Sequence, residues 1–350
     1  MNTQQFPIVK IDRTTGQEML PLLIQKGIFS DFQNLPLKEE ILSAECARLG
    51  VDILTDEQKR QVLASVGKYR SHNFIVRHYG NYQVGFGIAN FSDENIAGAL
   101  ERVSLHKLGL RVAQIILSEV YAQRKTVDLV ISKEKILRYL GYSSYEKQIY
   151  RQIDDVMFSL SNLNYYIHEY KTNTSGRVKC KEWGWFVYAV KADSKNYTLS
   201  VNHNFVGCIQ AVINNEKGTN RDLSRGYYSF PTALLPASRD YSAPALLLAN
   251  FLLLDSGNSK LNTGKSKIVA YSIGRLMEIM KIENKRKNEA KDAFLDALEE
   301  VTIINKTQPP ISELRKMKST KFTEQIVRIY IPSDIEKLDD SIKSNLLAVK

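Results

Sequence analysis

The feature that most restricts the fold of this chain is an internal repeat, in which two stretches share one pattern of capping and apolar residues. Ser132 and Ser272 lie 140 positions apart (272 minus 132), and each is suited to cap the short helical pattern that follows it. Apolar positions of the two short helices match at the same offset: Ile136 with Leu276, Leu137 with Met277, and Leu140 with Met280. The chain is therefore expected to use one supersecondary unit twice.

The helix that follows each short helix extends the match at an offset of 141 residues (294 minus 153), which one inserted residue in the intervening turn would explain. Any two amphipathic helices can be aligned somehow, but here the helix caps and the following strands align as well. The matched apolar pairs are Ile149 with Ala290, Ile153 with Phe294, Val156 with Ala297, Met157 with Leu298, Leu160 with Val301, and Leu163 with Ile304.

Apolar periodicity and alternation predict that each unit combines helices with short strands. In the first unit the expected helices are Leu105–Ala122, Lys133–Leu140 and Tyr145–Leu160, and the expected strands are Val127–Ile131, Tyr165–Tyr170, Trp183–Val190 and Tyr197–Val201. In the second unit the expected elements are helix Ala245–Leu254, strand Ile268–Ala270, a helix from Ser272 to Met280, a helix over 285–299, a β-branched run Val301–Ile304 and strand Ile326–Tyr330. Helix, strand, basic loop and strand is the layout of a winged helix.

These elements predict an α+β protein with two tandem winged-helix domains (helix-turn-helix plus β-wing) and an additional N-terminal α+β region. That region is expected to hold helices Lys38–Leu49 and Asp56–Val66 and a β-hairpin over 74–88, and no function is assigned to it. The segment 214–226 is polar and punctuated by glycine, which is typical of a linker. The expected limits are 1–100 for the N-terminal region, 104–213 for the first winged-helix domain, 214–240 for the linker, 241–331 for the second domain and 332–350 for a C-terminal tail.

A net charge of +10 and a pI near 9.2 favour an anionic partner. Basic and amide side chains, which contact phosphates and base edges, gather at the start of the second helix of each unit and in the loops that would form the wings. A charged helix face is more often merely solvated, but here each face is followed by a basic loop. The candidate DNA-binding residues are Lys285, Arg286, Lys287, Asn288, Lys291, Arg315, Lys316, Lys318 and Lys321 in the second unit, and Lys147, Gln148, Arg151, Gln152, Arg177, Lys179 and Lys181 in the first.

The sequence contains no convincing motif for catalysis, so we expect no catalytic residues, no metal and no cofactor. Asn262–Ser266 resembles the end of a phosphate-binding loop, but Ser259 stands where that motif needs glycine. His72 and His78 are six residues apart, which is the wrong spacing for the paired metal ligands of a nicking enzyme. The cysteines are too widely separated for a metal or redox pair and are interpreted as structural thiols: Cys46, Cys180 and Cys208.

The remaining sequence features favour a cytoplasmic protein with no membrane partner. No apolar run approaches the length of a membrane span, and the first residues lack the apolar core of a signal peptide. Alternating aromatic residues at 183–188 could stack on single-stranded bases. A strand with one buried and one exposed face is the favoured interpretation of that pattern.

The arrangement resembles the iteron-binding plasmid replication initiators, which contain two winged-helix domains in tandem. The resemblance covers roughly 104–331, and its pattern matches are LGLRVAQIILSEVYAQRKTVDLVISKEKILRYLGYSS, YRQIDDVMFSL and NYTLSVNHNF in the first unit, and YSIGRLMEIMKI with the basic helix in the second. It implies a non-enzymatic, sequence-specific double-stranded DNA-binding protein. By the resemblance, the first domain would dimerise or touch DNA, the second would read direct repeats at an origin, and host replication proteins would be further partners.

The N-terminal 100 or so residues depart from the compact initiators of that family, which leaves other functions open. These are an initiator of a phage or mobile element, a transcriptional regulator built from the same modules, and, from a different class, a DNA-nicking replication enzyme. Direct repeats beside the gene's own promoter would favour initiation, and a lone palindrome would favour regulation. A covalent protein–DNA adduct formed with a divalent metal ion and single-stranded origin DNA would identify a nicking enzyme.

Overall fold

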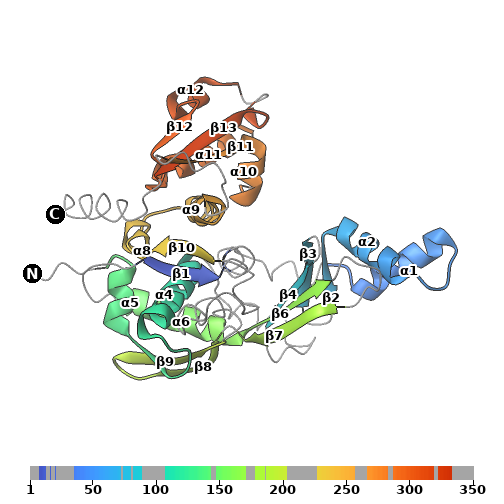
Figure 1. The fold of residues 1–350 in the computed structure, drawn as a ribbon, viewed down its shortest axis with the longest axis horizontal. Coiled ribbons are helices and arrows are strands. Elements are labelled where there is room, and N and C mark those ends of the chain that lie inside the picture. The colour runs from blue at the N-terminus through green and yellow to red at the C-terminus, as the bar shows by residue number, and fades with distance from the viewer. Residues whose placement is uncertain are drawn as a thin grey trace, which may run out of the picture.

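The structure, a computed structural model, is α+β and contains two small three-stranded antiparallel sheets, each accompanied by helices (Figure 1). It describes residues 8–12, 16, 20, 35–71, 74–79, 82–88, 107–142, 147–170, 178–185, 187–202, 227–256, 266–282, 287–318 and 322–332.

The first repeat, called unit 1 below, has three helices and a three-stranded sheet. Its elements are α4 (Lys107–Gln123), β5 (Leu129–Ser132), α5 (Lys133–Tyr139), α6 (Lys147–Asn162), β8 (Val187–Ala192) and β9 (Asn196–Val201). The strand order is β5-β9-β8, with both pairs antiparallel. The last strand therefore lies in the middle of the sheet, between the strand before the helix pair and the strand after it.

The second repeat, unit 2, has the same order of elements. They are α9 (Ala243–Ser256), β11 (Ser266–Ser272), α10 (Ile273–Ile279), α11 (Lys287–Glu300), β12 (Lys306–Gln308) and β13 (Ile326–Pro332). The strand order, β11-β13-β12, is also the same. Helix, strand, helix, helix and two strands, with the last strand central, is winged-helix topology, so the expected fold class is confirmed.

The helix caps show that the two units are built from equivalent residues. The Ser132 hydroxyl accepts a hydrogen bond from the Lys135 amide at 3.1 Å, and the Ser272 hydroxyl accepts one from the Arg275 amide at 3.3 Å. Each short helix ends with a Schellman motif, in which the amide two residues after the C-cap residue donates to a carbonyl near the end of the helix. Those bonds run from Tyr142 to Leu137 at 2.9 Å and from Ile282 to Met277 at 3.0 Å.

The 140-residue offset therefore holds through both caps, whereas the buried positions of the next helix follow the 141-residue offset. Ile153, Val156, Met157 and Leu160 are buried in α6, and Phe294, Ala297, Leu298 and Val301 are buried in and just after α11. The register changes after Tyr142 and Ile282, which is where the inserted residue was expected.

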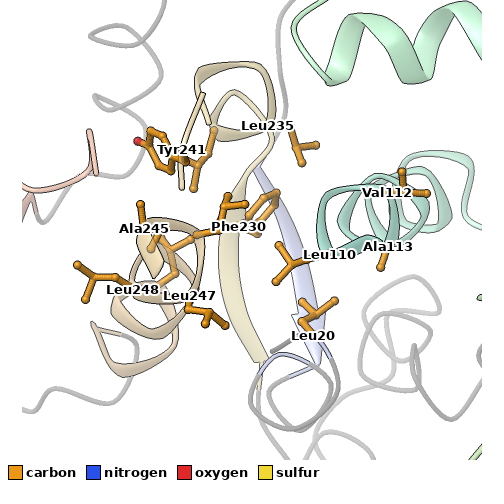
Figure 2. Close-up of a cluster of buried hydrophobic side chains, with 14 of the residues drawn as sticks. Leu20, Leu110, Val112, Ala113, Phe230, Leu235, Tyr241, Ala245, Leu247 and Leu248 are labelled. Carbon is orange, nitrogen blue, oxygen red and sulfur yellow. The ribbon is translucent and has the colours of Figure 1, made fainter. Parts of the chain in front are cut away.

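A two-stranded ribbon connects the units. β1 (Ile8–Asp12) pairs antiparallel with β10 (Tyr227–Pro231), and the ribbon lies between α4 and α9 (Figure 1). Figure 2 shows Phe230 of β10 with Leu110 of α4 to one side and Leu247 of α9 to the other. All three side chains are buried in one apolar core that extends through both units.

The second half of the segment expected as a linker takes part in this core. Residues 227–240 form β10 and the short helix α8 (Leu234–Ala237), and most of them are buried. Residues 214–226 lie outside the described part of the chain.

The N-terminal region forms a helical hairpin and a sheet. Its elements are α1 (Lys38–Leu49), α2 (Asp56–Val66), β2 (Lys68–Ser71), β3 (Phe74–Tyr79) and β4 (Tyr82–Ile88), and both helices begin and end where the sequence predicted. Two strands that lie between α6 and β8 in the chain complete this sheet, β6 (Leu163–Tyr170) and β7 (Val178–Trp185), in the order β2-β3-β4-β6-β7.

This pairing corrects the expected wing of unit 1. The β6–β7 hairpin joins the N-terminal sheet through β4, and the single strand expected over Trp183–Val190 is divided between two sheets at residue 186. Strand alternation shows which residues face a core, but it does not show which strand is the partner.

Two expectations for unit 2 also need correction. The β-branched run Val301–Ile304 is a turn that buries Val301 and Ile303, and the strand follows later, at β12. The segment expected as a basic loop contains a helix, α12 (Ile311–Lys316). Leu314 of α12 is buried, and this apolar anchor explains why the segment packs onto the unit.

Candidate nucleic-acid interface

In unit 2, the first residues of α11 expose cationic and amide side chains to solvent. Lys287 and Asn288 are exposed in its first turn, and Lys285 and Arg286 lie just before the described part of this helix. Phe294 on the opposite face is fully buried and packs edge-to-face against Phe322, with ring centroids 5.8 Å apart. The helix is therefore fixed by its apolar face while its N-terminus, which carries partial positive charge, is presented to solvent.

The rest of the exposed face of α11 is acidic. Glu289, Asp292, Asp296 and Glu299 are all exposed along its length. Carboxylates repel phosphates, so a duplex can approach this helix favourably only at its first two residues, Lys287 and Asn288. Insertion by the N-terminal residues is also how the second helix of a helix-turn-helix contacts base edges.

Lys291, one turn further along α11, is engaged within the protein. Its ammonium donates hydrogen bonds to the carbonyl oxygens of Arg315 and Met317, both at 2.6 Å. It also lies 5.5 Å from the centre of the Phe322 ring. The structure thus places this candidate residue between α11 and the end of α12.

Arg315 at the end of α12 is likewise directed back to α11. Its guanidinium lies 2.9 Å from Asp296 and 3.0 Å from Glu299, and hydrogen bonds to these two carboxylates raise the pKa of Arg315. The three side chains are 40–60% exposed, so water screens the ion pairs and each stabilises little. Lys316 and Lys318 are exposed at the same end of α12, and Lys321 lies outside the described residues.

In unit 1, the equivalent helix α6 presents Lys147, Gln148 and Arg151 to solvent at its start, with Gln152 half-buried beside them. Its next turn again turns acidic, because Asp154 and Asp155 are exposed. Asp154 accepts a hydrogen bond from the Tyr197 hydroxyl and lies 3.4 Å from the Lys133 ammonium. Both units therefore share one arrangement, in which basic and amide side chains begin the helix and exposed carboxylates follow.

The structure separates the other unit 1 candidates from α6. Lys179 and Lys181 lie in β7, at the end of the N-terminal sheet, where Lys181 pairs with His168. Arg177 lies outside the described residues.

The groups that hold the turn between α5 and α6 in unit 1 were not predicted from the sequence. Arg111 of α4 is only 3% exposed, and its guanidinium donates to the carbonyl of Leu140 at 2.9 Å and to that of Leu235 at 2.6 Å. Burial lowers the pKa of Arg111 to about 10. From the far side of the turn, Arg239 donates to the Gly141 carbonyl at 3.2 Å. A single arginine inside the apolar pattern of α4 was the available signal.

Within the described part of the chain, no group of three or more histidine, cysteine, aspartate or glutamate side chains is placed to hold a metal ion. Among the same residues, no helix is both long and apolar enough to cross a membrane.

Comparison with known proteins finds matches among solved structures and none among family models or curated proteins. No protein-family model matches the sequence, and no curated protein matches it. A crystal structure of domains 2 and 3 of RctB is similar over 76% of this chain and 90% of that chain, with 9% sequence identity and a TM-score of 0.39. A second crystal structure of the same two domains covers 76% of this chain and 92% of that chain, with 10% identity and a TM-score of 0.38.

Proposed function

We propose that this chain is a non-enzymatic protein that binds double-stranded DNA sequence-specifically through two winged-helix domains. The observation that carries the proposal is the repeated arrangement itself. Two units of equivalent topology each present basic and amide side chains at the start of the second helix, at Lys287 and Asn288 in one and at Lys147, Gln148 and, one turn on, Arg151 in the other. Lysine and arginine neutralise phosphates, and arginine, asparagine and glutamine can form paired hydrogen bonds with base edges.

In this proposal each first turn enters a major groove and the acidic body of each helix stays away from the phosphates. The exposed Lys316 and Lys318 at the end of α12 contact the backbone beside the groove that α11 enters. A pI near 9.2 supports an anionic partner and predicts binding that weakens steeply with salt.

The finer proposal is that the target is a set of direct repeats at a replication origin and that the protein initiates replication in the cytoplasm. It rests on the tandem arrangement of two winged-helix domains and on the family resemblance of the sequence. Footprinting on the DNA around the gene tests it, because evenly spaced protected repeats of one orientation would support initiation. A single protected palindrome over a promoter would instead indicate a transcriptional regulator.

The direct test of DNA recognition is the replacement of Lys285, Arg286 and Lys287 together by alanine. Specific duplex binding should be lost in a mobility-shift assay, while the circular dichroism spectrum and thermal melt stay those of the wild type. A folded triple variant that binds like the wild type would show that α11 does not enter the groove.

A further inference from the structure

The exposed cations at the end of α12 are held near the start of α11 by contacts that converge on one side chain. We propose that Lys291 is a positioning residue, which fixes α12 and its exposed lysines beside the DNA-contacting turn of α11 and does not itself bind phosphate. This inference rests on the proposed function, because it concerns how the duplex is contacted.

The ammonium of Lys291 finds its hydrogen-bond acceptors within the protein. A lysine ammonium has three donors, and two of them are used at 2.6 Å on the carbonyls of Arg315 and Met317. The ammonium also lies 5.5 Å from the centre of the Phe322 ring. In the sequence, Phe322 follows the 318–321 segment and Met317 precedes it. Lys291 thus contacts the chain on both sides of Lys318 and, at Arg315 and Met317, on both sides of Lys316.

These bonds matter because α12 is too short to be stable alone. It has six residues, and its last carbonyls have no partners within the helix. Met317, which follows it, has extended backbone at φ −68° and ψ 144°, so the helix does not continue. A cation that caps these carbonyls also interacts favourably with the negative end of the helix dipole.

The ion pairs that Arg315 forms between α12 and α11 are weaker than the contacts of Lys291. Arg315 reaches Asp296 and Glu299, but all three side chains are 40–60% exposed and their pairing is screened by water and salt. Lys291 is half-buried and binds uncharged carbonyls, so salt affects its contacts less. At the salt concentrations at which DNA binding is measured, Lys291 is therefore the main polar determinant of where α12 lies.

Unit 1 supplies a matched control. Arg151 is the fifth residue of α6, as Lys291 is the fifth residue of α11, and it is exposed. In unit 1 the place of α12 in the chain is taken by the β6–β7 hairpin, which pairs with the N-terminal sheet. Arg151 is accordingly expected to act as a single phosphate or base contact and to position no wing.

The experiment measures the affinity of the full-length protein for a duplex by fluorescence anisotropy from 50 to 300 mM salt. Each phosphate contact contributes about 0.9 to the slope of log affinity against log salt. Replacing Lys316 and Lys318 by alanine should lower the slope by about 1.8. Lys291→Met should produce a similar loss, Lys291→Arg should restore most of it, and Arg151→Met should lower the slope by only about 0.9.

The decisive comparison is a double-mutant cycle. If Lys291 acts through Lys316 and Lys318, Lys291→Met should change the slope little once both lysines are already alanine. A further loss of about 0.9 in that background would make Lys291 an independent phosphate contact and overturn the proposal. An unchanged slope for Lys291→Met in the wild-type background would also overturn it.

A second measurement does not depend on DNA. Lys291→Met should accelerate amide hydrogen exchange in residues 311–317 without affecting α11, and Arg151→Met should leave those amides unchanged. Unchanged exchange in α12 would overturn the positioning role. If the wild-type protein bound no duplex at any salt, the proposed function would fail, and the exchange result would still decide whether Lys291 fixes α12.

Discussion

Gly141 is the residue at which one added methyl group should perturb the contact between unit 1 and the α8 segment most clearly. Its φ is +82°, and a β-carbon built on it would lie 3.1 Å from the Pro236 carbonyl oxygen and 3.3 Å from the Arg239 side chain. An L-residue in the left-handed region costs about 1–2 kcal/mol. Forcing a side chain against a packed backbone carbonyl costs about 1 kcal/mol or more.

We therefore expect Gly141→Ala to lower the free energy of unfolding by about 2–3 kcal/mol. Lys281 is the matched control, because it occupies the equivalent turn of unit 2 with a φ of +54° and already carries a side chain. Lys281→Ala should change stability by less than about 0.5 kcal/mol.

Urea denaturation followed by circular dichroism measures both variants, since a change in midpoint at constant slope reports the change in stability. Equal midpoints for Gly141→Ala and the wild type would refute the close packing of α8 on this turn. A loss of only about 1–2 kcal/mol for Gly141→Ala would show that the backbone conformation alone, and not the contact with α8, sets the cost.

Three further predictions concern the caps, the buried tyrosines and the basic first turn. Ser132→Ala and Ser272→Ala should each lower the free energy of unfolding, measured by urea denaturation, by about 1 kcal/mol, because each removes one N-cap hydrogen bond. Losses that differ between the two variants by more than about 1 kcal/mol would argue against equivalent units. Burial, reinforced by Glu119 at Tyr139 and by Asp154 at Tyr197, raises the pKa of both tyrosines above the ordinary 10.0. The free energy of unfolding should therefore keep the full contribution of these tyrosines below pH 10 and lose it as the pH rises above 10. Urea titrations at pH 9 and 10.5 should show a smaller fall for Tyr139→Phe than for the wild type. Lys287→Ala should lower the salt slope of duplex binding by about 0.9, measured by anisotropy, and an unchanged slope would remove it from the interface.

Much of the fold follows from local sequence signals. Ser132 and Ser272 mark helix starts because their hydroxyls can bond the backbone amides that a helix leaves unpaired. The buried stripes of α6 and α11 follow from helical periodicity, and the repeat between them follows from matching those stripes. These signals act over a few residues, so they remain visible without any knowledge of tertiary contacts.

The features that the sequence did not reveal depend on partners distant in the chain. β6 alternates as any strand does, and only the free edge of β4 determines that it joins the N-terminal sheet. β1 and β10 pair across more than 200 positions to connect the units. α12 is too short to be recognised from periodicity and depends on Leu314 and on the bonds from Lys291.

The candidate interface could be predicted only in part, because its internal contacts also depend on partners distant in the chain. Composition and spacing show where cations occur, but they do not show which cations are engaged within the protein. Lys291 and Arg315 have the same local signals as Lys287 and Lys316, and yet their side chains bond to carbonyls and carboxylates of the same unit. The acidic body of α11 was visible in the sequence, but its role in confining the positive surface to the first turn appears only once exposure is known.

The central claim, that two equivalent units recognise specific duplex DNA, is tested most directly by selection from a pool of random duplexes with the purified protein at two salt concentrations. The account predicts an enriched motif of one to two helical turns that persists at the higher salt, because base contacts add to the phosphate contacts. Binding without an enriched motif, lost at moderate salt, would contradict it and would show that the basic surface is not a sequence-specific DNA-binding site.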